Sequence, residues 1–170
     1  VAGERALAVN AYEEALDHFQ RALTIEEGRT MDQETADLLF GIGKARAATL
    51  HRHEIEEVLD GLRQAFNYYV DAGDVGQAIE VAEYRIPGAN GRLTGVARIL
   101  ARALDLVPAD SHEAGRLLAI YGLIVGLEDE PDYESAGELL GRALVIARRA
   151  GDTTLEITVL DRLGQVNYYH

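Results

Sequence analysis

The sequence predicts an all-α protein in which antiparallel helix pairs stack into an α-α superhelix with a period of about 40 residues. Three observations carry this prediction. Apolar residues recur at helical spacing, β-branched residues in strict alternation are missing, and small residues recur at nearly constant intervals. With 170 residues and 48% hydrophobic residues, the chain has the composition of a folded protein. We therefore expect a single repeat domain over residues 1–170.

Eight helices are predicted from amphipathic stretches, and the chain opens part-way through a further helix that contains Gly3. The eight stretches cover approximately residues 11–27, 33–51, 54–71, 75–85, 93–106, 111–128, 132–150 and 153–169. The three prolines, Pro87, Pro108 and Pro131, all fall between these stretches, where they interrupt no helix.

The helix boundaries follow from residues that end one helix and begin the next. Gly73 is placed to end 54–71 and Asp74 to cap 75–85, and Gly151 with Asp152 repeats this arrangement before 153–169. Ser111 is placed to open 111–128. That stretch contains the longest apolar run, residues 117–127, which is shorter than the about 20 residues of a membrane-spanning helix. A buried helix is the better interpretation, and no membrane association is expected.

Two series of small residues indicate an internal repeat. The first series, with steps of 40, 39, 40 and 42 residues, is Gly3, Gly43, Ala82, Gly122 and Gly164. The second series, in which a large apolar residue follows each member, is Ala22, Ala65, Ala103 and Ala143. Two antiparallel helices approach closely only where one of them presents glycine or alanine. We therefore expect the first series on the first helix of each pair and the second series on the second helix.

The segment 10–23 resembles the second half of a tetratricopeptide repeat, because Ala15 and Ala22 stand at the required spacing after Gly3. The same motif recurs in residues 132–144. The chain departs from that family in its longer period and in its lack of tryptophan, and HEAT-like pairing is the neighbouring possibility. Segments 91–95, 103–108 and 110–116 are similar to helical repeat regions of large bacterial signalling proteins. In those proteins an NTPase module precedes the repeats, and a LuxR-type DNA-binding or nucleotide-cyclase domain lies elsewhere.

The resemblance implies a non-catalytic interaction scaffold within a cytoplasmic signal-transduction or transcription regulator, bound by a protein, a peptide or neighbouring domains of the same chain. Because neither terminus has the polar character of a capping repeat, we expect a fragment of a longer array that self-associates through its ends. A sensor domain that binds a small effector in the superhelix groove is the alternative.

Composition and motifs argue against other functions. The net charge of −13 repels phosphate backbones, so this segment is not expected to bind nucleic acid. Without cysteine, thiolate chemistry and thiolate metal sites are excluded. The segment 41–45, Gly-Ile-Gly-Lys-Ala, lacks the first glycine and the final Ser/Thr of a phosphate loop, so helix packing is expected there. His51 and His53 would point apart on a helix. We predict no enzyme, no metal and no cofactor.

The predicted binding face is the concave side, which the first helices of stacked pairs form. Counting from each small residue places on it Asp37, Phe40, Lys44, Ile79, Glu83, Arg116, Ala119, Leu123, Asp161, Gln165 and Tyr168. This mixture of charged and apolar residues suits a peptide, a neighbouring domain or a small effector.

Overall fold

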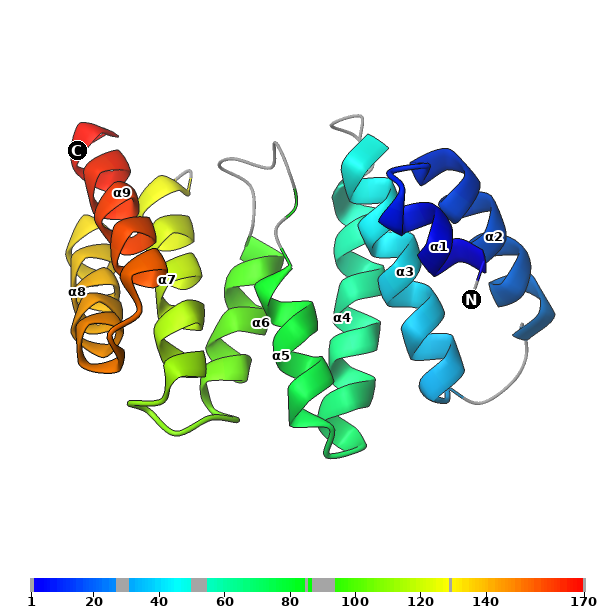
Figure 1. Ribbon diagram of the computed structural model, residues 1–170, viewed down its shortest axis with the longest axis horizontal. Helices are drawn as coiled ribbons and strands as arrows, with labels where there is room; N and C mark the ends of the chain where they lie inside the picture. Colours follow the sequence, from blue (N-terminus) through cyan, green and yellow to red (C-terminus); the bar gives the residue numbers. More distant parts are fainter. Residues whose placement is uncertain are drawn as a thin grey trace. The chain divides into compact units, whose positions relative to one another are not determined.

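The computed structural model describes residues 2–26, 31–49, 55–84, 86, 94–128 and 130–169, and all regular secondary structure in these ranges is α-helical (Figure 1). The helices are α1 (Ala2–Ala8), α2 (Tyr12–Glu26), α3 (Gln33–Thr49), α4 (Ile55–Asp71), α5 (Val75–Glu83), α6 (Thr94–Leu104), α7 (His112–Leu127), α8 (Tyr133–Ala150) and α9 (Thr153–Tyr169). The all-α prediction is confirmed, and each predicted stretch has its helix within a few residues. The finer expectation of a superhelix stays a prediction.

The contacts divide the chain into two compact units, unit 1 (Val1–Ala89) and unit 2 (Asn90–His170). In unit 1, α1 packs on α2, α2 on α3, α3 on α4 and α4 on α5, and α1 also contacts α3. In unit 2, α6 packs on α7, α7 on α8 and α8 on α9, and α7 also contacts α9. Within each unit, this is the neighbour pattern of consecutive helix pairs that stack on one another. The expectation of one domain over 1–170 stays a prediction.

One core cluster of unit 1, formed by residues of α1, α2 and α3, contains the ring of Phe19. A Cβ added at Gly3 of α1 would lie 2.6 Å from Cε1 of this ring, and one added at Gly41 of α3 would lie 2.6 Å from its Cζ. Both glycines therefore let a neighbouring helix approach the same edge of one buried aromatic side chain. Gly43 has a similar role further along α3, where an added Cβ would lie 2.8 Å from Leu62 of α4.

The core of unit 2 has the same kind of contact between α7 and α8. A Cβ added at Gly122 would lie 2.7 Å from Leu140, and Ala143 is fully buried close by. The expected close approach at small residues is thus confirmed at Gly3, Gly43 and Gly122. It is wrong at Gly164 of α9, because an added Cβ there meets no described atom within 4 Å.

The helix starts follow the predicted capping residues Asp74, Ser111 and Asp152, and Asp132 is a further cap that was not predicted. The side chains of Asp74, Ser111, Asp132 and Asp152 accept hydrogen bonds from backbone N–H groups in the first turn of α5, α7, α8 and α9. Before α5 and α9, Gly73 and Gly151 have φ values of 74° and 67°, the left-handed conformation that glycine adopts without strain. Across the described ranges, no helix combines the length and the apolarity that a membrane span needs.

Replacing Gly41 by alanine is expected to destabilise the protein, whereas the same change at Gly61 is not. The methyl group at Gly41 would overlap Phe19, a cost of about 1–3 kcal/mol that outweighs a helix-propensity gain of about 1 kcal/mol. At Gly61 of α4, the nearest atom to an added Cβ is the Leu39 carbonyl oxygen at 3.6 Å, so only the propensity gain remains. Urea unfolding followed by circular dichroism measures both variants. Equal stabilisation by the two substitutions would show that the ring of Phe19 is not confined.

Unit 2 is expected to lose stability in acid through its capping aspartates. Hydrogen bonds from Ser135 lower the pKa of Asp132, and the N–H of Leu155, followed by His112, lowers the pKa of Asp152. A depressed folded-state pKa adds stability above the ordinary value of 3.8, and this contribution disappears as pH falls through the folded-state pKa.

The double substitution Asp132→Asn and Asp152→Asn tests this linkage, because asparagine caps a helix without titrating. We expect the urea midpoint of the variant to depend less on pH than that of the original chain between about pH 5 and about pH 3. Identical pH profiles would contradict the assignment.

Candidate binding site

A cavity of about 440 Å³ lies in unit 1 and is lined by residues of α1, α2, α3 and α5. We call it the first-helix pocket, because the sequence predicts α1, α3 and α5 to be the first helices of successive pairs; this pairing stays a prediction. Its lining comprises Ala2, Gly3, Glu4, His18, Phe19, Ala22, Glu34, Asp37, Leu38, Phe40, Lys44, Gln77 and Glu80. Three residues of the predicted binding face, Asp37, Phe40 and Lys44, therefore line one cavity.

Phe40 and Lys44 form one side of the first-helix pocket. The ring of Phe40 is almost fully buried and meets the ring of Tyr84 edge to face, with centroids 5.9 Å apart. The ammonium nitrogen of Lys44 lies 4.5 Å from the centroid of the Phe40 ring and 3.7 Å from a carboxylate oxygen of Glu4. Lys44 is thus held by a cation–π contact and by an ion pair at the same time. The Tyr84 hydroxyl donates to the Lys44 carbonyl oxygen at 3.1 Å, which links this turn of α3 to the end of α5.

Asp37 is fixed from behind by α4. The hydroxyl of Tyr69, a buried residue of α4, donates a hydrogen bond to the Asp37 carboxylate. Burial, followed by this hydrogen bond and the negative charge of Asp37, raises the pKa of Tyr69 well above its ordinary value. The phenol therefore stays protonated and remains a donor, and the carboxylate of Asp37 keeps a defined position in the pocket wall.

The first-helix pocket is acidic. Four carboxylates line it, from Glu4, Glu34, Asp37 and Glu80, against the single ammonium group of Lys44. With His18 neutral, the lining has an excess of three negative charges. Charge of one sign around a concave surface with apolar walls concentrates the field and attracts counter-charges.

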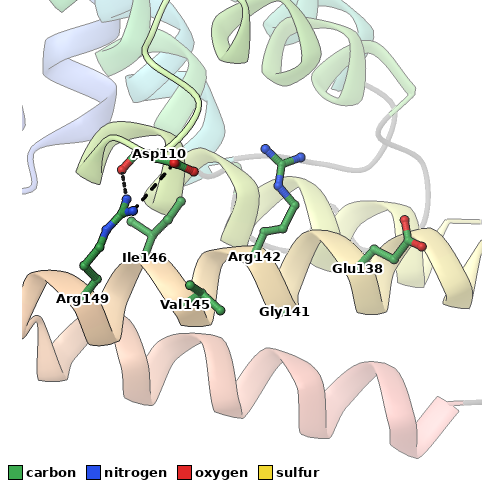
Figure 2. A pocket seen from close by; sticks show the side chains of 7 residues that line it. All are labelled: Asp110, Glu138, Gly141, Arg142, Val145, Ile146 and Arg149. Atoms are coloured by element: carbon green, nitrogen blue, oxygen red, sulfur yellow. Dashed lines mark hydrogen bonds and ion pairs between the residues drawn. The ribbon is translucent and has the colours of Figure 1, made fainter.

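Two further cavities lie elsewhere. One, of about 460 Å³ in unit 2, is formed by α8 and Asp110; Arg149 donates to the Asp110 backbone carbonyl and lies 3.7 Å from its carboxylate (Figure 2). Figure 2 shows Arg142 extending from the same side of α8 as Ile146. The other, of about 480 Å³ in unit 1, lies among α2, α3 and α4 and is lined by Arg46, Glu57 and Gln64, among others.

The remaining predicted residues line none of these cavities. Glu83 is half-buried at the end of α5. In α7, Arg116 lies 3.1 Å from the His112 ring nitrogen Nδ1, and Leu123 packs against the core of unit 2. In α9, the side-chain amide of Gln165 donates to Asp161 at 2.6 Å.

Two residues were wrongly expected on an accessible face, because Ile79 is 5% exposed and Ala119 is fully buried, both within the helix core. A concave face that runs through both units stays a prediction.

Sequence reasoning missed Glu4, Glu34 and Glu80. Glu34 lies one turn before Asp37, and Glu80 lies one turn before Glu83, so a wider arc around the predicted positions would have included both. Glu4 lies in the short helix α1, and its place beside the pocket depends on how α1 packs against α3, which no local pattern reveals.

The motifs that suggested chemistry have structural explanations where the structure describes them. The segment 41–45 lies inside α3, and its Gly43 packs against Leu62, as expected for helix packing. Within the described ranges, no three histidine, aspartate or glutamate side chains gather as metal ligands. His51, His53 and Glu54 lie outside these ranges. The prediction that the chain is not an enzyme stays a prediction.

Replacing Tyr69 by phenylalanine should destabilise the protein by about 1–2 kcal/mol, because it removes the donor to Asp37 and keeps the buried ring. Tyr12→Phe is the matched control, since the Tyr12 hydroxyl donates to Asn10 at 2.7 Å in an exposed position. We expect this control to change stability by less than about 0.5 kcal/mol. Urea unfolding measures both variants, and equal effects would contradict a fixed position for Asp37.

No protein-family model and no curated protein matches this chain, so the resemblance to tetratricopeptide-like regions rests on the sequence motifs alone.

Proposed function

We propose that the chain is a non-catalytic interaction module whose first-helix pocket binds a segment of another protein, a peptide or a neighbouring domain of the same polypeptide. The observation that carries the proposal is the gathering of Asp37, Phe40 and Lys44 around one cavity. The sequence predicts these residues on first helices, and first helices supply the binding face of stacked helix pairs.

The size and composition of the pocket support this function. A volume of about 440 Å³ accommodates one or two side chains of an extended segment. Ala22 and Leu38 are half-buried apolar residues of the lining, whereas Phe19 and Phe40 are only 5% and 4% exposed. The charged groups of the lining supply direction and selectivity. A binding role of this kind needs no assembled catalytic group.

The wider setting is proposed from the motifs. The tetratricopeptide-like phrases and the period of about 40 residues favour a superhelical repeat region of a cytoplasmic bacterial signalling or transcription regulator. In such a setting the bound segment belongs to another domain of the regulator or to a partner protein. An effector-binding sensor is the alternative. In the cavity of unit 2, Arg149 is engaged by Asp110, while Arg142 lines the same cavity.

A bulky substitution in the pocket tests the proposal. Gln77→Trp places an indole in the wall formed by α5, and Gln64→Trp places the same group in the cavity among α2, α3 and α4. Peptides selected from a phage-displayed random library on the original chain are then titrated against both variants. We expect Gln77→Trp to weaken binding about tenfold or more and Gln64→Trp to leave it within about twofold.

Circular dichroism confirms that both variants are folded. If Gln64→Trp alone abolishes binding, the site is the cavity among α2, α3 and α4. If the library yields no binder, or if neither tryptophan matters, the first-helix pocket is not an interaction site.

A further inference from the structure

We infer that the segment bound in the first-helix pocket presents an arginine or lysine side chain to it. The inference rests on the proposed function, because it names the chemistry of the segment that the pocket accepts. It follows from the charges of the lining, from the apolar residues of the same lining and from the contacts that Lys44 makes with Phe40 and Glu4.

The acidic residues of the pocket are not neutralised from within. Lys44 is paired with Glu4 at 3.7 Å, which leaves Glu34, Asp37 and Glu80. Among the described residues, none of these three has a cationic partner; Asp37 accepts from Tyr69, and Glu80 from the Gln77 amide at 3.4 Å. Carboxylates that share a cavity repel one another, and a bound cation relieves this repulsion.

The cavity that the carboxylates line also has an apolar part, which suits the stem of a long basic side chain. Ala22 and Leu38 are half-buried apolar residues of this lining, while Phe19 and Phe40 are almost fully buried. Arginine and lysine pack their methylene stems along apolar surface while the charged head reaches polar groups. Short acidic side chains would have neither a cationic partner other than Lys44 nor a stem to cover this apolar part.

Lys44 shows within the protein how such a group is held. Its ammonium nitrogen lies above the ring of Phe40, 4.5 Å from the centroid, and contacts the carboxylate of Glu4. The pocket thus combines an aromatic face with a carboxylate around a cation. Because Lys44 already covers the ring of Phe40, a basic side chain of a partner would pair with Asp37, Glu34 and Glu80 instead, and Lys44 would repel it.

One of the acceptors is held in place before binding. The hydroxyl of the buried Tyr69 donates to Asp37, whereas Glu80 accepts only a long hydrogen bond of 3.4 Å from the Gln77 amide in an exposed position. Acceptors with fixed positions lose little conformational freedom when a ligand binds, which improves affinity and selectivity. Charge and geometry therefore favour the same class of ligand.

Three fluorescein-labelled peptides test the inference. They share an alternating leucine frame of about nine residues, and the alternate positions carry arginine, neutral citrulline or glutamate. Fluorescence anisotropy with the full chain is expected to show binding of the arginine peptide, binding at least about tenfold weaker for citrulline, and none for glutamate. Raising the salt concentration should weaken the binding of the arginine peptide.

Substitutions with opposite expected effects localise the interaction. The double substitution Asp37→Asn with Glu80→Gln keeps the acceptors for Tyr69 and Gln77 but removes two charges. It should weaken the binding of the arginine peptide about fivefold or more. Lys44→Met removes the repelling cation and should tighten binding by about twofold or more. The control pair Glu13→Gln and Glu56→Gln removes the same charge from exposed positions of unit 1 outside the pocket, and should change affinity less than about twofold.

The outcomes separate this inference from the proposed function. Equal weakening by the control pair means that the net charge of −13 attracts the peptide, and the inference is wrong. A second outcome would support the proposed function but overturn the inference. In it, the selected library peptides lack basic residues, Gln77→Trp blocks their binding, and Asp37→Asn with Glu80→Gln leaves their affinity unchanged. Arginine-peptide binding that Gln77→Trp does not affect would place the basic side chain elsewhere and also overturn it.

Discussion

The close approach of α1 and α3 to the ring of Phe19 is the constraint on which the pocket of unit 1 depends. Gly3 and Gly41 leave room for the same ring edge, so three helices from two successive pairs meet at one side chain. This contact brings the start of α1 beside the middle of α3, where Glu4 meets Lys44. The electrostatic character of the pocket is therefore a consequence of how tightly the apolar core beneath it packs.

Polar contacts between neighbouring helices then fix the groups that the packing brings together. Tyr69 of α4 holds Asp37 of α3, and the Tyr84 hydroxyl, just after α5, holds the backbone of Lys44. Tyr69 is buried and Tyr84 is half-buried, and in both cases the hydroxyl satisfies an acceptor on α3. Tyr69 and Tyr84 thus contribute to the geometry of the first-helix pocket without lining it.

The sequence was sufficient to predict the helices and some residues of the site, for identifiable reasons. Helix starts were predictable because Asp74, Ser111 and Asp152 form local caps that need no tertiary contact. Asp37, Phe40 and Lys44 were predictable together because three- and four-residue steps place them on one helix face. Glu4 was missed because its place beside Lys44 depends on the register between α1 and α3, which contacts such as Phe19 with Gly41 determine. Glu34 and Glu80 lie one turn from predicted positions and needed only a wider arc. Ile79 and Ala119 were misplaced because they pack within the helix core.

The contact between Tyr69 and Asp37 also determines which way hydrogen bonds can run across the pocket wall. An ionised carboxylate has about four lone-pair positions and no proton, and the buried phenol occupies only one position at Asp37. The acidic wall is therefore made of acceptors with unused capacity. A carbonyl oxygen of a partner finds nothing to accept from on these carboxylates. An ammonium group brings three hydrogen-bond donors and a guanidinium group five. These carboxylates would therefore favour hydrogen-bond donors over acceptors, in addition to favouring positive charge.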